Sequence, residues 1–183
     1  MTKGSAHVAQ WYLGRPVEGT HTGTNFGTPW MEKEGTSNVV MKFESGALGY
    51  HFGTWGAKGT RLGYAVHAHG TEGMLELDFA GGRIVLHADP TGGDLPALLA
   101  KYGVHPEGSR EMILCESEGG KPTNRELEHF LDCVESGAAP ETNGRQSLQS
   151  LRVIWRMYDA EERGVVADLR GLGLDQFTGG EVC

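Results

Sequence analysis

The alternation of bulky and small residues between positions 37 and 88 constrains the fold of this chain more than any other feature. Successive side chains of a β-strand point to opposite faces of the sheet, so a period of two residues predicts strands. Turns such as Glu44, Ser45 and Gly46 separate the alternating runs. We predict a meander of about five strands over residues 37–43, 47–55, 61–69, 74–79 and 83–87.

The second of these runs has two unlike faces. Leu48, Tyr50 and Phe52 share one face, whereas Gly49 and Gly53 lie on the other. An apolar sheet face needs a cover of helices or of a second sheet. We therefore expect the chain's own helices to cover the bulky face. The Gly/Ala-rich face is then open to a second copy, which predicts a homo-oligomer through that face.

Two helices are predicted toward the C-terminus. Thr123 and Glu126 form a capping box, T-x-x-E, and Gly137 ends the helix that follows. Its apolar stripe consists of Leu127, Phe130, Leu131 and Val134. The second helix is predicted over residues 144–163. Its buried side is expected to hold Leu148, Leu151, Ile154, Trp155 and Tyr158.

The remaining segments carry weaker patterns. We predict a short helix over residues 7–13, a loop over residues 19–35, and strands over residues 111–115 and 165–169. The expected fold class is α+β, with an open-faced, mostly antiparallel sheet and helices packed on one face. Residues 1–170 are expected to form one domain, and residues 171–183 a loose tail.

Charge and composition exclude several classes of protein. The net charge is −8 and no basic patch occurs, which argues against a nucleic-acid partner. No apolar run approaches the roughly 18 residues that a membrane span requires. Three cysteines without C-x-x-C spacing fit a reducing compartment, so we expect a cytoplasmic protein. No G-x-G-x-x-G turn follows a strand and no Walker loop occurs, so we expect no cofactor-binding residues.

Histidines provide the only sequence argument for a metal. His67 and His69 share a face of one predicted strand, and His51 joins them if the turn at residues 56–59 pairs Ala65 with His51. Three imidazoles could bind zinc or another transition metal. The alternative is a set of surface histidines bonded to their neighbours, and we therefore assign no metal ligand.

Candidate site residues are few. His7 could act as a general acid or base, because the pKa of histidine lies near neutrality, and Gln10 lies one helical turn from it. Trp30 lies in a glycine-rich loop, where an aromatic side chain can line a substrate pocket. Glu161 and Glu162 are interpreted as part of a solvated helix face.

Four segments together resemble the C-terminal domain of the Gfo/Idh/MocA family of NAD(P)-dependent oxidoreductases. They are WYLGRPVE at residues 11–18, VVMKFESGALGYHFGTW at 39–55, AHGTEGMLELD at 68–78, and the run from ELEHFLDC to ERGVVADL at 126–169. The segments occur in the family's order and cover about residues 7–170. The departure is at the family's D-x-x-x-H motif, where an ungapped match from Trp11 places Gly4 at the histidine. Only a shift brings His7 there, without an acidic partner.

The resemblance implies an open-faced α+β domain whose partner half, a Rossmann domain, would bind NAD or NADP. It implies a substrate-binding and oligomerisation domain of a dehydrogenase of sugars or polyols, and we expect no independent catalysis without that half. The alternative is a non-catalytic module that dimerises or binds a small-molecule ligand. A lesser alternative is a metal-binding β protein that uses His51, His67 and His69.

Overall fold

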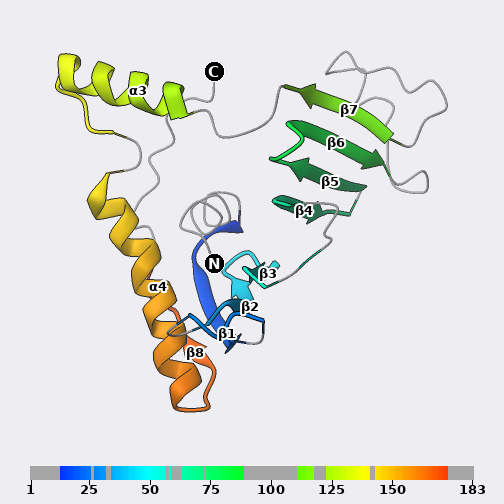
Figure 1. Cartoon of the computed structure of the whole chain (residues 1–183), viewed down its shortest axis with the longest axis vertical. Coiled ribbons are helices and arrows are strands. Elements are labelled where there is room, and N and C mark those ends of the chain that lie inside the picture. The colour runs from blue at the N-terminus through cyan, green and yellow to red at the C-terminus, as the bar shows by residue number, and fades with distance from the viewer. Residues whose placement is uncertain are drawn as a thin grey trace. The chain divides into compact units, whose positions relative to one another are not determined.

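The residues that the computed structural model describes form two four-stranded sheets and two helices (Figure 1). It describes residues 13–25, 27–31, 34–56, 58, 63–71, 73–88, 111–117, 123–140 and 143–172. The chain divides into two compact units, Met1–Lys58 with Asp132–Cys183, and Gly59–Leu131. The α+β class with antiparallel strands is confirmed, but the strands form two sheets and not one. The single domain expected over residues 1–170 stays a prediction.

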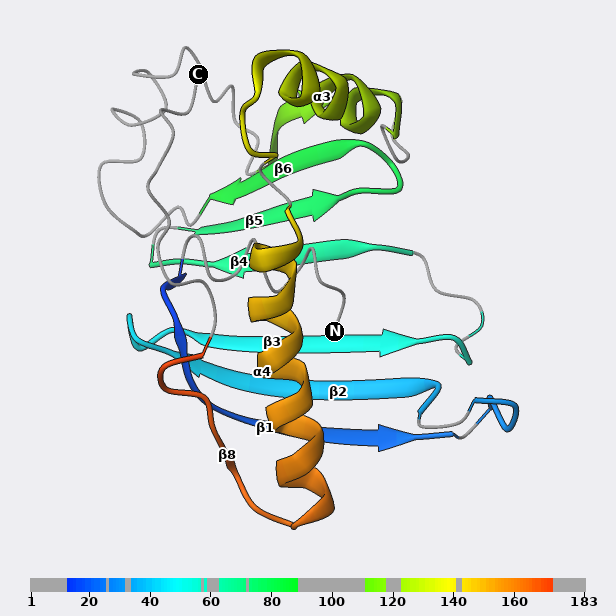
Figure 2. The ribbon, with the colours of Figure 1, turned by 90° about the vertical axis from the view of Figure 1, so that its left-hand side faces the viewer.

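Sheet A belongs to the first unit and has the strand order β3-β2-β1-β8. Its strands are β1 (Pro16–Thr24), β2 (Thr36–Phe43), β3 (Leu48–Thr54) and β8 (Ala167–Asp168). Neighbouring strands are antiparallel, and the register places Gly19, Met41 and Gly49 side by side across the sheet. Helix α4 (Gly144–Glu162) lies across one face of β1 and β2, as Figure 2 shows.

We call the α4 side of sheet A its inward face, and the core lies there. Val39, Met41 and Phe43 of β2 pack against Val153 and Met157 of α4. The cluster continues through Ala160, Ala167, Leu169 and Leu172. Leu172 is buried in this core, so tight packing extends two residues past the predicted domain end at 170.

The predicted orientation of β3 is wrong. In the observed register Gly49 and Gly53 lie beside Met41 and Ser37 on the inward face. A methyl group at Gly49 would lie 2.8 Å from Phe43 Cε2, so the glycine makes room for the largest core side chain. The outward face holds Val40, Leu48, Tyr50 and Phe52, which are all exposed. The Gly-rich face of sheet A is therefore covered by the chain itself, and the bulky face is open.

Two further predictions in this unit are also wrong. Residues 16–24, expected mostly as loop, form strand β1, where Gly19 fits beneath Met157 and Leu169. The buried stripe of α4 is rotated from the predicted one and consists of Ser150, Val153, Met157 and Ala160. Small residues on this stripe suit a helix that approaches a glycine-containing sheet closely. The predicted helix over residues 7–13 lies outside the described residues except for Leu13.

Sheet B belongs to the second unit and has the order β4-β5-β6-β7. Its strands are β4 (Ala65–His69), β5 (Gly73–Asp78), β6 (Arg83–Ala88) and β7 (Glu111–Glu116), all antiparallel. The register gathers Val66, Leu75, Leu77, Ile84 and Leu86 on one face. The opposite face pairs His67 with Glu76 and His87 with Glu111, at 3.3 and 3.5 Å.

Helix α3 (Thr123–Ser136) begins at the predicted capping box and ends at Gly137, whose φ of 71° is the left-handed conformation that favours glycine. Its predicted apolar stripe, Leu127, Phe130, Leu131 and Val134, is about half exposed or more. Neither described helix is long and apolar enough to span a membrane.

Candidate functional site

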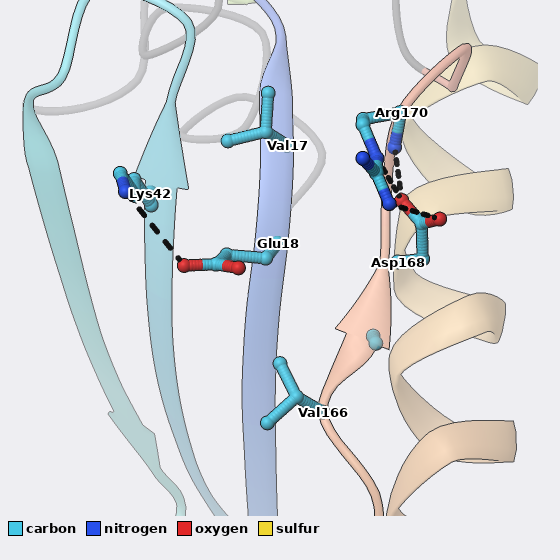
Figure 3. Close-up of a pocket in the computed structure, with 7 residues that line it drawn as sticks. Val17, Glu18, Lys42, Val166, Asp168 and Arg170 are labelled. Atoms are coloured by element: carbon cyan, nitrogen blue, oxygen red, sulfur yellow. Dashed lines mark hydrogen bonds and ion pairs between the residues drawn. The ribbon is translucent and has the colours of Figure 1, made fainter.

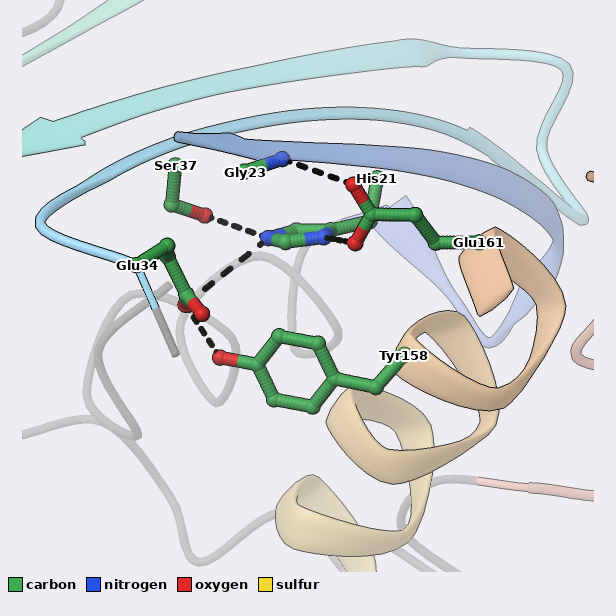
Figure 4. A network of polar contacts seen from close by, with 6 residues as sticks. All are labelled: His21, Gly23, Glu34, Ser37, Tyr158 and Glu161. Atoms are coloured by element: carbon green, nitrogen blue, oxygen red, sulfur yellow. Dashed lines mark hydrogen bonds and ion pairs between the residues drawn. The ribbon is translucent and has the colours of Figure 1, made fainter. Parts of the chain in front are cut away.

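A polar network centred on His21 lies where the C-terminal part of α4 meets the inward face of sheet A (Figure 4). His21 is only 8% exposed. Its Nδ1 lies 2.6 Å from Glu161 Oε2, and its Nε2 lies 2.8 Å from Ser37 Oγ. An ionised carboxylate only accepts hydrogen bonds, so Nδ1–H of His21 is the donor to Glu161. The histidine thus links the helix to the two central strands.

The same helix contributes a second contact to the network. Tyr158 donates its hydroxyl to Glu34 Oε1, and its ring meets the His21 ring edge-on at 4.8 Å between centroids. The backbone N–H of Gly23 donates to Glu161 Oε1 at 2.8 Å. Burial and the Glu34 carboxylate raise the pKa of the Tyr158 hydroxyl above its ordinary value. Glu34 and Glu161 are therefore held in fixed positions at the end of the sheet.

A small pocket of about 160 Å³ opens beside these carboxylates. Its lining consists of Gly23, Glu34, Tyr158, Glu161 and Glu162. Each carboxylate oxygen has two lone pairs, so the pocket can accept hydrogen bonds from a ligand's hydroxyl groups. Carboxylates also repel anionic groups, which disfavours a phosphate or acid ligand.

The order Glu161–His21–Ser37 has the hydrogen-bond pattern of an acid–base–nucleophile triad. Ser37 is buried and does not line the pocket, so its hydroxyl has no access to a substrate. We therefore assign this serine a structural role, in which it satisfies the second nitrogen of His21.

Of the three predicted site residues, the structure describes one. His7 and Gln10 lie outside the described residues. Trp30 is described and is 72% exposed, in the connection between β1 and β2. Trp55, which directly follows β3, is 81% exposed and was not predicted. Both tryptophans lie at the end of sheet A that also carries Glu34.

The three histidines proposed for a metal belong to different units. His51 lies on β3 of the first unit, where β3 pairs with β2, and His67 and His69 lie on β4 of the second unit, where β4 pairs with β5, so their grouping stays a prediction. His67 contacts Glu76, and the ring centroids of His67 and His69 lie 6.4 Å apart. Among the described residues no three His, Cys, Asp or Glu side chains form a group that could hold a metal ion. Burial lowers the pKa of His51 to about 4.

A second, wider pocket of about 460 Å³ lies at the β1–β8 edge of sheet A (Figure 3). Lys42 and Glu18 are 4.0 Å apart there, and Arg170 donates to both carboxylate oxygens of Asp168 at 2.8 Å. Hydrogen bonds from Arg170 lower the pKa of Asp168 to about 2. Each charged side chain lining this pocket thus has a partner of opposite sign, and the pairs are solvent-exposed.

Sequence reasoning missed most of the His21 network. Glu161 was assigned to a solvated surface, and His21 and Glu34 fell in a predicted loop. One signal was present, because Tyr158 and Glu161 are three residues apart and share a helix face. Their partners come from 124 and 140 residues away, and spacing alone does not indicate contacts over such distances.

No protein-family model matches the sequence, and no curated protein matches it either. Solved structures of oxidoreductases do match. Levoglucosan dehydrogenase, in complex with NADH and levoglucosan, superposes with a TM-score of 0.66 at 14% identity, over 93% of this chain and 49% of that chain. Aldose-aldose oxidoreductase from Caulobacter crescentus, complexed with glycerol, gives a TM-score of 0.65 at 20% identity, over 91% and 45%.

An oxidoreductase from Agrobacterium radiobacter, in complex with NAD+, L-tartaric acid and magnesium, gives a TM-score of 0.64 at 18% identity, over 91% and 47%. The chain spans about half the length of each of these structures. At these identities the likeness establishes the fold. This α+β fold is the one that the Gfo/Idh/MocA resemblance implied.

Proposed function

We propose that the chain is the substrate-binding and oligomerisation half of an NAD(P)-dependent oxidoreductase that acts on sugars or polyols. The main support is the structural match over about nine-tenths of the chain to about half of several oxidoreductases. Two of the matched structures hold levoglucosan or glycerol, both rich in hydroxyl groups. The carboxylate-lined pocket at Glu34 and Glu161 suits ligands of this chemistry.

The roles of individual residues follow from the same proposal. His7 acts as the acid or base, as the resemblance implies, and Gln10 and Trp30 contact the substrate. NAD or NADP supplies the hydride chemistry and is held by a nucleotide-binding half outside these 183 residues. The described residues do not fit the cofactor, because they form no glycine-rich turn from a strand into a helix.

Titration of the 183-residue chain with NADH, followed by nucleotide fluorescence, tests whether the nucleotide is held outside these residues. We expect no saturable binding, because no described residues here cradle a pyrophosphate. Tight binding of NADH would overturn the assignment as a substrate half. A sugar or polyol panel, measured by ligand-observed saturation-transfer NMR, tests the other part. If the panel finds no binder, the alternative of a non-catalytic dimerising module gains support.

The outward face of sheet A is our candidate for self-association. Val40, Leu48, Tyr50 and Phe52 form an exposed apolar patch on β2 and β3. Lys42, Glu18 and Asp168 lie on the same face and place both signs of charge at its edge. A second copy of the chain related by two-fold symmetry could pair these opposite charges across an apolar centre. This face replaces the Gly-rich face that the sequence suggested.

Light scattering with size-exclusion chromatography tests this surface. The wild-type chain should be a dimer or larger, and Phe52→Asp should shift it toward monomer. Val165→Asp is the matched control, because Val165 is equally exposed but lies in the turn after α4. A strictly monomeric wild type at high concentration, or equal effects of both substitutions, would contradict the assignment.

A further inference from the structure

Three side chains that can bind a soft metal ion lie in one row across sheet B. The strand register sets His69 of β4 opposite Met74 of β5, and Met74 opposite His87 of β6. Residues directly opposite each other in neighbouring antiparallel strands point to the same face of the sheet. The two imidazoles therefore flank the thioether from both sides. We call His69, Met74 and His87 the histidine–methionine row.

The backbone hydrogen bonds determine how closely the row is spaced. Gly70 N donates to Gly73 O at 2.8 Å, so the next pair along, His69 and Met74, is of the non-hydrogen-bonded kind. The Cα atoms of such a pair are about 4.5 Å apart, closer than in a hydrogen-bonded pair. Since strands lie about 4.8 Å apart, roughly 10 Å separate the Cα atoms of His69 and His87. Two imidazole rings that lean toward the middle strand can span that distance above the sulfur of Met74.

The His87 ring has one nitrogen without a partner. Its Nε2 is buried and has no hydrogen-bond partner among the described residues. Its Nδ1 lies 3.5 Å from Glu111 Oε1. A histidine that binds a metal through one nitrogen commonly donates the other N–H to a carboxylate. Buried polar atoms are normally paired, so the unpartnered nitrogen is an independent observation that points to a ligand.

The row can be reached from solvent, and a neighbouring histidine stands apart from it. His69 is exposed, and Met74 and His87 are half-buried. His67 lies on the same face of β4, but its Nε2 lies 3.3 Å from Glu76 Oε2. The nitrogen of His67 is thus engaged by a carboxylate in the next row of the sheet.

We propose that the histidine–methionine row binds one Cu(I) ion through a ring nitrogen of each histidine and the sulfur of Met74. Thioether sulfur is a soft ligand that selects Cu(I), and imidazole nitrogen also suits copper. Methionine completes the set, because no third His, Cys, Asp or Glu side chain joins these histidines in the described part of the chain. The row lies in one unit and shares only His69 with the set considered from the sequence. The inference does not depend on the proposed function.

Anaerobic titration of the full chain with Cu(I) tests the row, with the methionine methyl groups labelled with ¹³C and observed by NMR. Cu(I) is diamagnetic, so bound signals shift and are not lost. We expect the methyl signal of Met74, identified as the one that Met74→Leu removes, to shift saturably with one equivalent of metal. The other methionines are internal controls. Zn(II), whose usual ligands do not include a thioether, should shift this signal far less at the same concentration.

Substitutions then identify the nitrogen ligands. His69→Ala and His87→Ala should each raise the Cu(I) concentration at half-saturation by about tenfold or more, since even the loss of a ligand's orienting partner costs about 10–100-fold. His67→Ala is the matched control, on the same strand and face as His69. Because thiols compete for Cu(I), all variants are compared in a chain that carries Cys115→Ser and Cys183→Ser. Circular dichroism melts establish that each variant is folded.

The Met74 methyl signal decides the outcome. If it does not shift at saturating Cu(I) in the folded wild-type chain, the proposal is overturned, even if copper is taken up elsewhere. Equal losses of affinity in His67→Ala and His87→Ala would refute the assignment of the nitrogen ligands. An equal shift of the Met74 signal with Zn(II) would refute the selection of a soft metal.

Discussion

Gly49 provides a direct test of which face of sheet A is buried. Its position lies on the inward face, and a Cβ there would come within 2.8 Å of Phe43 Cε2. Phe43 is 1% exposed and is the largest fully buried side chain in the described residues. Gly49→Ala therefore forces a methyl group into contact with a ring that has little room to move.

The magnitude follows from two opposing effects. Overpacking a core costs about 1–3 kcal/mol, whereas replacing glycine inside a strand returns about 0.5–1 kcal/mol of backbone entropy. The free energy of unfolding should fall by about 1–2 kcal/mol on balance. For a chain of this size that corresponds to a decrease in Tm of about 2–8 °C.

Thermal and urea unfolding, followed by circular dichroism, measure the change. Gly144→Ala is the control, because a Cβ at this position would have nothing within 4 Å and the residue begins a helix, where alanine is favourable. Replacing the ring by a smaller side chain makes room for the methyl group. The double variant Phe43→Leu/Gly49→Ala should therefore lose less unfolding free energy than the sum of the two single losses. A neutral or stabilising Gly49→Ala would refute the packing of Phe43 on Gly49 and restore the opposite face assignment.

Three further predictions concern polar groups of sheet A and of helix α4, which packs on it. His21→Ala leaves Glu161 and Ser37 without their shared partner, and should cost about 2–4 kcal/mol of unfolding free energy in urea titrations; a loss under about 0.5 kcal/mol would contradict the network. Burial lowers the pKa of His51 to about 4, so its stabilising contribution is complete above pH 6.5 and is lost as the pH falls from 6.5 toward 4. His51→Gln should make the urea midpoint less dependent on pH over that interval. An unchanged pH dependence would show that His51 is not responsible. Tyr158 should remain un-ionised where ordinary tyrosines titrate, so Tyr158→Phe should leave the phenolate absorbance gained between about pH 9 and 11 unchanged; a decrease equivalent to one tyrosine would contradict the raised pKa.

Local patterns predicted the elements with strong periodicity. The strands around residues 37–43, 47–55, 74–79 and 83–87 are present, as are both C-terminal helices with their glycine ends. Capping boxes, turn glycines and period-two alternation are set by short-range sterics and hydrogen bonds, so the sequence displays them directly. The strand predicted at residues 111–115 is also present as β7.

Which face of sheet A is buried could not be predicted in the same way, because burial depends on which side chains pack above the sheet. Leu48, Tyr50 and Phe52 look like core residues, yet Phe43 and Met157 occupy the inward space and leave room only for glycine beside them. Strand β1 was not predicted, for the same reason. Gly19 and Gly23 weaken its intrinsic strand signal, and only tertiary packing explains them.

The site was predictable only in part. Trp30 was predicted because aromatic side chains in loops can line substrate pockets; the structure shows it exposed in the connection between β1 and β2, and its role stays a prediction. His21 and Glu161 are 140 residues apart in sequence, and no local rule pairs them. The His51, His67 and His69 hypothesis depends on a pairing of β3 with β4, and these strands belong to different units, so the hypothesis stays a prediction.

The glycines that lie beneath α4 in sheet A make neighbouring positions of the same strand differ in how well they tolerate substitution. Gly19 and Gly49 leave no volume to spare, so a saturation mutagenesis screen scored on folding should accept almost nothing larger than alanine there. Leu48 and Tyr50, one residue away, should accept many side chains in such a screen and be filtered only when assembly is scored. Alternate positions of β3 would then be constrained for two different reasons. The inward positions would be constrained by folding, and the outward positions by the proposed self-association.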